Sequence, residues 1–446
     1  MDLNVQHYLS VIPRIYRAHQ KQTIRIQPKH TFLTLEGKYT VHVLPRYRFE
    51  SNDRFCHFSS IEVEARNNAL TFDYAFGAEQ EYLLRAVPVE NTARVRHTLV
   101  TSIYALDEDL YGLCVAKGDL HMHTTHSDGL ENVEHRIVQA RKNGHDFLAV
   151  TDHNAYYGSL RAITILSKVP SNMVALHGEE IHADFCPVHI LSLGAREGIA
   201  PQVVNRPVEN KQLLHQIMDE YRDLLPEDVD LRAFASAQDV FRRIRQAGGM
   251  SVLCHIYWDA IVPEQGTRQG VAEQLVDALV AHREFDAFEI TSGAPGNDTK
   301  ANYLQEIYYR EHLPENFPII GITDSHTTDE TLGSIFGKNY TIVFAKEFSE
   351  EGIMDALRST RAVSVDAVSG NGVCHGSLRL CKFATFLRSF YFPVHDAVVR
   401  SEGDCMERID AGQMQYLPIL QTLCQDNLQS LEAEWHPILP RKPLPH

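Results

Sequence analysis

The sequence predicts a mixed α/β protein whose central part is an α/β barrel, with an antiparallel β domain before it and a mostly helical extension after it. Residues 21 to about 110 alternate apolar and polar side chains, which is typical of half-buried strands. Short apolar runs separated by amphipathic stretches recur from about residue 115 to 370, as they do in parallel sheets. With 446 residues, the chain is also too long for one ordinary hydrophobic core.

The first domain is expected to span residues 1–112 and to be sandwich-like. Residues 61–65 and 70–76 each place their apolar side chains on one face, with Asn67 and Asn68 between them. This pattern predicts a hairpin. The function of the domain stays open between carbohydrate binding, an oligomer contact and substrate gating, of which we expect one of the last two.

The second domain is expected to span residues 113–372, and seven apolar runs are its candidate strands. They are the run into His121 and residues 147–150, 173–176, 189–193, 250–254, 285–290 and 317–323. Residues 131–144 are typical of a helix that stops at Gly144. A strand after Thr341, a helix from about Ser349 and a strand near 361–366 should close the domain.

The remaining residues, 373–446, are expected to pack on the barrel as a helical extension. Apolar side chains between Leu417 and Trp435 have helical spacing, although Pro418 should interrupt it early. We interpret this stripe as core packing, without a cofactor role.

Charge and composition exclude several classes of protein. The formal net charge is −16 and no basic stripe is present, so we expect no duplex nucleic acid as a partner. No apolar run approaches the length that spans a bilayer, which indicates a cytoplasmic protein without a membrane partner. The eight cysteines include no CxxC pair, so we interpret them as reduced thiols.

Metal-binding residue types stand beside most of the apolar runs. Because the carboxyl ends of parallel strands lie on one rim of a barrel, residues that follow different strands should converge there. His121 and His123, like Asp324 and His326, are two positions apart and therefore share one face of an extended segment. Imidazoles and carboxylates without thiolates suit Mn, Fe or Zn, and so many donors can hold more than one ion.

Together these motifs form a recognisable pattern. The quoted segments are HMH at 121–123, SDG at 127–129, TDHN at 151–154, GEE at 178–180, His189, GG at 248–249 with His255, and DSH at 324–326. In order and spacing, the chain over about residues 115–370 resembles the polymerase and histidinol phosphatase (PHP) family of metal-dependent phosphoesterases. The resemblance implies a distorted (β/α)7 barrel with two to three divalent ions at its rim.

Carried over by position, the resemblance implies three sets of ligands. The first ion would be held by His121, His123, Glu180 and Asp324, the second by Glu180, His189 and His255, and the third by Asp128, His153 and His326. Glu180 is preferred to Glu179 because the family's motif is Gly-x-Glu. Two positions depart from the family: Ile256 stands where Pro often follows the histidine, and Val188 stands where Gly commonly precedes His189.

Glu180 and Asp324 are thus expected to serve catalysis as well as metal binding, and a leaving group also benefits from a proton donor. His126, Asp152 and His182 are the candidate donors, although orienting a ligand is the more expected role for each.

Several further residues have two interpretations. Tyr257 and Trp258 are either substrate-stacking residues or part of a buried rim, and Glu289 either orients a ligand or caps a strand end. His135 and His282 lie in helical stretches, where a structural role is expected.

The function expected from this pattern is hydrolysis of a small phosphorylated metabolite or nucleotide. Two ions about 3.5 to 4 Å apart activate a bridging water and compensate charge on the phosphoryl oxygens. Two alternatives remain open: hydrolysis of a carboxylic or carbamic ester or amide, and a non-catalytic module that metal stabilises. A homo-oligomer is possible.

Overall fold

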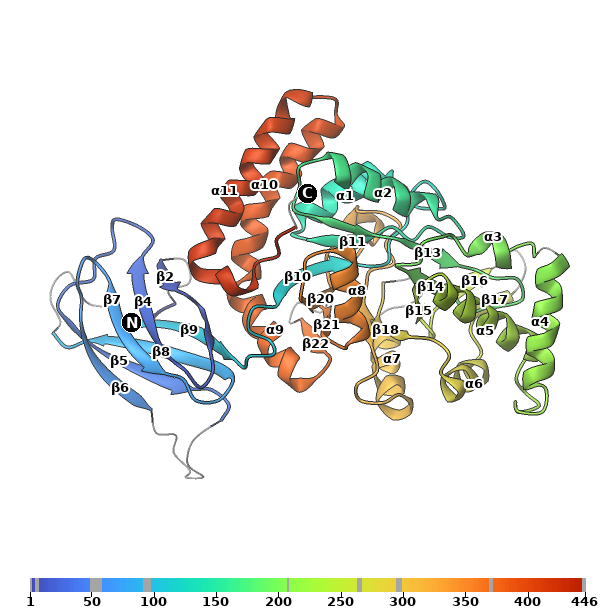
Figure 1. Ribbon diagram of the computed structural model, residues 1–446, viewed down its shortest axis with the longest axis horizontal. Helices are drawn as coiled ribbons and strands as arrows, with labels where there is room; N and C mark the ends of the chain where they lie inside the picture. The colour runs from blue at the N-terminus through green and yellow to red at the C-terminus, as the bar shows by residue number, and fades with distance from the viewer. Residues whose placement is uncertain are drawn as a thin grey trace. The chain divides into compact units, whose positions relative to one another are not determined.

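The protein is described by a computed structural model that covers residues 2–4, 8–48, 58–90, 98–206, 208–262, 267–293, 299–368 and 372–442 (Figure 1). The chain divides into two compact units. The first contains Met1–Cys114, Lys382–His395 and Gln425–Leu439, and the second contains Val115–Cys381, Asp396–Cys424 and Pro440–His446. The protein is therefore mixed α/β with an N-terminal β region.

The N-terminal strands of the first unit form two sheets around one core. The larger sheet contains β1 (Asp2–Asn4), β3 (Ile15–Arg17), β5 (Lys38–Pro45), β6 (Ser59–Glu64), β8 (Gln80–Pro88) and β9 (Thr98–Leu106). The smaller contains β2 (Leu9–Ile12), β4 (Lys21–Pro28) and β7 (Leu70–Ala75). Val41 and Leu84 of the larger sheet share a buried cluster with Ile24 and Phe72 of the smaller. Most strand pairs are antiparallel, but β1 and β3 run parallel to β9.

The hairpin predicted around Asn67 and Asn68 is wrong. Strand β6 pairs with β5 and strand β7 pairs with β4, so the chain passes from one sheet to the other at this turn. Only Arg66 and Ala69 pair across it. The alternation correctly showed which side chains face inward, but both sheets face the same core, so the alternation could not identify the neighbouring strand.

Helical segments from the end of the chain complete the first unit. The helices concerned are α9 (Leu378–Phe390), α10 (Phe392–Asp410) and α11 (Leu417–Trp435), each only in part. The guanidinium of Arg14 is buried against the Glu434 carboxylate at 2.8 Å and lies 5.7 Å from the centre of the Trp435 ring. Pro418 is the second residue of α11 and does not interrupt it, because proline is tolerated in the first turn of a helix.

The second unit contains two larger sheets. One has the order β12-β11-β10-β20-β21-β22 and the other β13-β14-β15-β18-β19. Their bounds are β10 (Cys114–Asp119), β11 (Phe147–Ala149), β12 (Val174–Leu176), β13 (Gly178–Ile181), β14 (Ile190–Leu193), β15 (Met250–Leu253), β18 (Ala287–Thr291), β19 (Ile319–Gly321), β20 (Asn339–Ala345), β21 (Ala362–Asp366) and β22 (Val373–His375). Each predicted apolar run overlaps one of these strands.

The strands of this unit are not all parallel. Strand β14 runs antiparallel to both β13 and β15, and β20 runs antiparallel to β21. The chain leaves one sheet after β12 and enters the other at β13, with His177 between them. A continuous seven-stranded barrel is therefore not confirmed. A separate ribbon of β16 (Asp259–Val262) and β17 (Thr267–Gly270) follows β15.

Helices separate most of these strands. They are α1 (Val133–Lys142), α2 (Tyr157–Lys168), α3 (Ala200–Val203), α4 (Val208–Tyr221), α5 (Leu231–Gln246), α6 (Glu273–His282), α7 (Thr299–His312) and α8 (Glu350–Arg358). The side chain of Asn132 caps α1, and Gly144 follows its last turn with a φ of 76°. Ser349 caps α8 by accepting the Gly352 N–H at 3.1 Å. Leu420 and Cys424 of α11 join the core cluster that contains Ile137 of α1.

Two further expectations concern cysteines and membranes. None of the cysteines among the described residues forms a disulfide, and Cys56 lies outside those residues. Among the helices that the structure describes, none combines the length and the apolar character needed to cross a bilayer.

Arg141 generates a stability prediction for the second unit. Its buried guanidinium contacts Asp146 at 2.9 Å and Glu402 at 2.7 Å. Arg141→Ala should lower the free energy of unfolding by about 3–5 kcal/mol, because it leaves two carboxylates buried without their cation. Urea denaturation measures this against Arg222→Ala, which removes an exposed pair with Asp219 and should cost less than about 1 kcal/mol. Equal losses in the two variants would contradict the prediction.

Candidate metal centre

The predicted ligands lie in or next to strands, and backbone pairing places several of the ligand segments side by side. Met122, after β10, pairs with Ser325, after β19, and the His123 N–H donates to the Ser325 carbonyl at 3.0 Å. His153, after β11, pairs with Glu180 of β13. These backbone contacts bring residues from distant parts of the sequence to one place.

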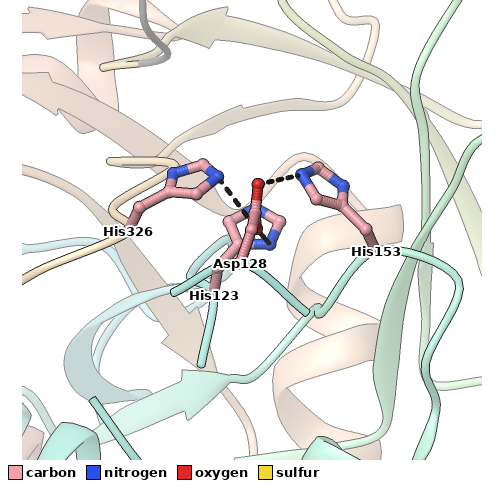
Figure 2. Close-up of side chains that lie close together, drawn as sticks. All are labelled: His123, Asp128, His153 and His326. Carbon is pink, nitrogen blue, oxygen red and sulfur yellow. Dashed lines mark ion pairs between the residues drawn. The ribbon is translucent and has the colours of Figure 1, made fainter. Parts of the chain in front are cut away.

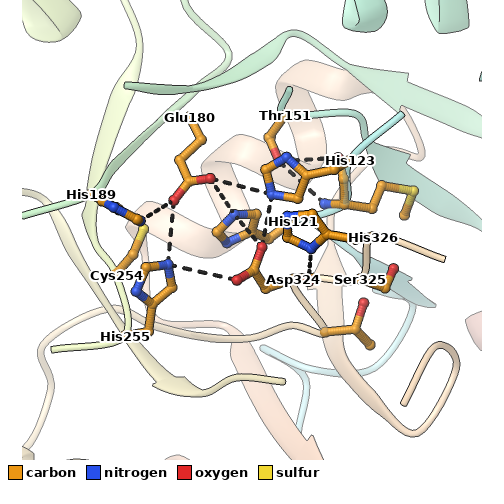
Figure 3. A network of polar contacts seen from close by, with 12 residues as sticks. His121, His123, Thr151, Glu180, His189, Cys254, His255, Asp324, Ser325 and His326 are labelled. Atoms are coloured by element: carbon orange, nitrogen blue, oxygen red, sulfur yellow. Dashed lines mark hydrogen bonds and ion pairs between the residues drawn. The ribbon is translucent and has the colours of Figure 1, made fainter. Parts of the chain in front are cut away.

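The first predicted set is fully assembled and buried. His121 Nε2 lies 3.2 Å from Glu180 Oε2 and 3.1 Å from Asp324 Oδ1. His123 Nε2 lies 3.3 Å and 2.8 Å from the same two oxygens. The side chains of His121, His123 and Glu180 have no exposed surface, and that of Asp324 is 5% exposed. Figure 3 shows the four side chains directed toward one another.

The second set shares Glu180 with the first. Glu180 Oε1 lies 3.0 Å from His189 Nδ1 and 3.3 Å from His255 Nε2, on the side of the carboxylate opposite His123 in Figure 3. His255 follows β15, but His189 precedes β14. The antiparallel direction of β14 explains the difference, because its first residues lie beside the last residues of β15.

The third set is the most exposed of the three. Asp128 Oδ2 lies 3.5 Å from His153 Nε2, and Asp128 Oδ1 lies 3.3 Å from His326 Nε2 (Figure 2). His123 joins this group, so that one imidazole borders both the first and the third sets. The Asp128 side chain is 57% exposed, whereas those of His153 and His326 are 21% and 24% exposed. This group therefore marks the side that solvent reaches.

Electrostatics at the site are dominated by two buried carboxylates among imidazoles. Burial opposes charge on Glu180, but the charge of His121 and hydrogen bonds from His121 and His123 hold the pKa of this carboxyl well below its usual range. Burial also opposes charge on Asp324, yet His121 and His123 lower its pKa. Burial lowers the pKa of His189 to about 3, despite attraction by Glu180, so its ring is neutral. A neutral imidazole and an ionised carboxylate are the protonation states in which these groups bind metals.

Unsatisfied polar atoms test whether the residues fit a metal. Four buried atoms that point into the same cluster have no hydrogen-bond partner within the described part of the chain: His121 Nε2, His153 Nδ1, Glu180 Oε2 and His189 Nδ1. A buried polar atom without a partner costs about 1–3 kcal/mol, so several that converge on one point fit a bound metal ion. Nitrogen and oxygen donors of this kind suit divalent Mn, Fe or Zn.

Glu289 contacts two of the ligand residues. Its Oε2 lies 3.3 Å from His121 Nδ1, and its Oε1 accepts the His255 N–H at 3.2 Å. The carboxylate is fully buried on β18. It is therefore placed to fix the orientation of the His121 ring, which leaves Nε2 for the metal cluster.

Asp152 supports the segment that follows β10. Its two carboxylate oxygens accept the Thr124 N–H at 2.6 Å, the Thr124 hydroxyl at 2.8 Å and the Ser127 hydroxyl at 2.8 Å. Three donors on one buried carboxylate favour a positioning role over proton donation. His126 is exposed, packs against the Tyr157 ring at 4.9 Å and lies outside the metal-binding groups found among the described residues.

The structure adds residues to the cluster that the ligand prediction did not include. His182 stacks on His189 with ring centres 3.7 Å apart, and its Nε2 lies 3.6 Å from Glu180 Oε1. Cys254 is buried and groups with His121 and Glu289. The sequence signal for both was adjacency, since His182 is two residues from Glu180 and Cys254 immediately precedes His255.

The remaining candidates are less closely connected to the cluster. His135 contacts the Thr328 hydroxyl at 3.3 Å, and His282 packs against the Tyr221 and Phe234 rings. The two family departures, Ile256 and Val188, are buried apolar residues.

Buried imidazoles and carboxylates that share one glutamate define a candidate site for divalent ions. Residues 119–227 match the family described as the PHP domain, and this match confirms the resemblance over that range. The matched range includes six of the nine predicted ligands: His121, His123, Asp128, His153, Glu180 and His189.

Similar proteins include two curated enzymes and a solved structure. The chain is 38% identical over 84 residues to a phosphoribosyl 1,2-cyclic phosphate 1,2-diphosphodiesterase from Eggerthella lenta, which covers 18% of this chain and 31% of the relative. It is 36% identical over 61 residues to the DNA polymerase/3'-5' exonuclease PolX of Bacillus subtilis. This match covers 14% of this chain and 11% of PolX. The solved structure is a two-domain protein from Bacteroides vulgatus that contains a predicted PHP-like metal-dependent phosphoesterase. It is 20% identical, with a TM-score of 0.39, and the match covers 57% of this chain and 66% of that protein. The chain thus matches about a third of the length of the diphosphodiesterase and about a tenth of the length of PolX.

Metal content should depend on the shared carboxylate. Glu180→Gln and Asp324→Asn should each lower the bound Mn, Fe or Zn from two to three equivalents to below about one, because each removes an anionic donor. Plasma mass spectrometry on protein purified without chelator measures the stoichiometry.

Glu179→Gln is the matched control, because Glu179 accepts the Ile199 N–H and lies outside the metal-binding groups. Equal metal loss from Glu179→Gln and Glu180→Gln would contradict the assignment of Glu180.

Glu289→Gln should weaken metal binding without abolishing it. A residue that orients a ligand typically changes metal affinity by about 10- to 100-fold. Zinc affinity is measured by competition with a chromophoric chelator, with Glu273→Gln as control because that carboxylate contacts the Tyr257 hydroxyl instead. Unchanged affinity in Glu289→Gln would exclude the orienting role.

Proposed function

We propose that the protein is a metal-dependent phosphoesterase that hydrolyses a small phosphorylated substrate at a site for two to three divalent ions. The observation that carries the proposal is the position of the Glu180 carboxylate. One of its oxygens faces His121 and His123, while the other faces His189 and His255. A carboxylate in this position is suited to bridge two ions.

The two inner sets of residues would hold a pair of ions. Ions bound there would supply an activated water and compensate charge on phosphoryl oxygens, which is what phosphate ester hydrolysis requires. Glu289 keeps the His121 ring in place, and Asp152 secures the chain at Thr124.

The outer set would bind the substrate's phosphoryl group together with a third ion. Asp128, His153 and His326 are partly exposed, so the substrate reaches this side without displacing core residues. His126, exposed near the same segment, is the proposed proton donor to the leaving group, because Asp152 is fully engaged.

The proposal also includes the fold. The two sheets of the second unit would be parts of a distorted (β/α)7 barrel over residues 113–372, preceded by a β domain and followed by a helical extension. The pairs Met122–Ser325 and His153–Glu180 support it, because both are parallel and the second links a segment after β11 in one sheet to β13 in the other.

Similarity to a cyclic phosphate diesterase supports a phosphate ester of a small metabolite as the substrate. The negative net charge agrees with a small-molecule partner in preference to duplex nucleic acid.

Activity should follow metal and phosphate chemistry. Mn-loaded protein should hydrolyse an aryl phosphate mono- or diester but not an aryl acetate, and Asp324→Asn should lower kcat more than about 100-fold, since even orienting residues are worth about 10- to 100-fold. Stopped assays of nitrophenol release, with and without chelator, measure both.

Glu227→Gln, a change at an exposed carboxylate, should leave the rate unchanged. Preferential turnover of the acetate would move the assignment to carboxylic ester hydrolysis. Absence of turnover on every ester, with metal bound, would instead favour a non-catalytic module.

A further inference from the structure

Trp258 lies against the second set of ligands. The backbone N–H of Trp258 donates to the His255 carbonyl at 2.9 Å, and this turn folds the chain back after β15. The indole ring consequently lies 4.7 Å from the His189 ring at an angle of 33° and 6.1 Å from the His255 ring. The ring therefore contacts both imidazoles that, with Glu180, form this set.

The neighbouring Tyr257 has a different environment. Its hydroxyl donates to Glu273 at 3.1 Å, its ring lies 6.3 Å from that of Tyr308, and it packs against the core of the unit. Of the two aromatic residues considered for substrate contact, only Trp258 adjoins the cluster. Its ring already packs against the ring of His189.

The indole nitrogen of Trp258 is a buried donor that has no hydrogen-bond partner among the residues that the structure describes. An indole N–H only donates, so it requires an acceptor atom and cannot bind a cation. Leaving such a donor unpaired is costly, so a ligand that offered it an acceptor atom would gain a favourable hydrogen bond. Beside residues that would hold a divalent ion, the complementary acceptor is an anionic oxygen.

We propose that Trp258 is a substrate-binding residue whose indole N–H donates a hydrogen bond to a non-bridging phosphoryl oxygen. This inference rests on the proposed function and narrows it: the substrate presents a free, negatively charged phosphoryl oxygen at the His189–His255 side of the site. Because the indole N–H is neutral, it can bind the phosphoryl oxygen without replacing the divalent ions as the partners of the site's carboxylates.

The sequence offers a direct spectroscopic test, because it contains only two tryptophans. The other, Trp435, is buried in the first unit beside Tyr391. Zn-loaded protein labelled with ¹⁵N-tryptophan should show two indole N–H signals, and Trp258→Phe assigns them. On titration with inorganic phosphate, the Trp258 signal should move downfield while the Trp435 signal stays in place.

Binding measurements separate a hydrogen bond from a general effect on the fold. In Mn-loaded protein, Trp258→Phe should raise the inhibition constant for inorganic phosphate by about 10- to 100-fold, the range for a hydrogen bond to a charged group. Its metal stoichiometry should equal that of wild type. Tyr257→Phe, which removes the neighbouring hydroxyl, should leave the inhibition constant unchanged.

The outcomes distinguish this inference from the proposed function. If wild type hydrolyses phosphate esters and binds phosphate, but the Trp258 signal does not move and Trp258→Phe binds phosphate equally well, the inference is overturned and the function stands. If metal-loaded wild type neither hydrolyses phosphate esters nor binds phosphate, both are overturned.

Discussion

Glu180 is a carboxylate without exposed surface, and much of the second unit can be understood from what a buried negative charge requires. Moving an uncompensated carboxylate into the interior is prohibitively costly, so partners must surround it. The imidazoles that do so come from segments spread over much of the unit: His121, His123, His153, His189 and His255. Each of these segments must therefore end at the same place, which constrains the path of the whole chain.

Hydrogen bonds between buried side chains and the backbone fix the convergence that the charges require. The buried Asp119 carboxylate accepts the N–H groups of His121 and Thr323, each at 3.2 Å, and so ties the segment after β10 to the one after β19. Arg136 of α1 also donates to the Ser325 carbonyl, at 3.0 Å. The ligand-bearing turns are thus held by buried groups that make no contact with solvent, and the imidazoles keep their geometry without depending on flexible loops.

Local sequence patterns predicted the strands well because an apolar run records burial directly. They predicted direction less well, because a short buried run such as 190–193 has the same composition whether it is parallel or antiparallel to its neighbours. His189 belongs to the site although it precedes its strand. The rule that ligands follow strands does not predict such a residue, and the family pattern was needed to identify it.

The choice between Glu179 and Glu180 shows the same limit. The two residues are identical in type and adjacent, and only the pleat of β13 decides which one faces the histidines. The Gly-x-Glu motif supplied that information, whereas periodicity could not. Likewise, alternation in residues 59–64 and 70–75 identified the inward faces but not the sheet to which each strand belongs.

The first unit draws residues from both ends of the sequence, and this has a consequence for its synthesis. Arg14 and its buried partner Glu434 are 420 positions apart. At a translation rate of about 5–20 residues per second, the N-terminal strands leave the ribosome between about 20 and 80 seconds before the helix that carries Glu434. During that interval the guanidinium of Arg14 lacks its carboxylate. The core of the first unit is therefore completed only after the helix that carries Glu434 has been synthesised.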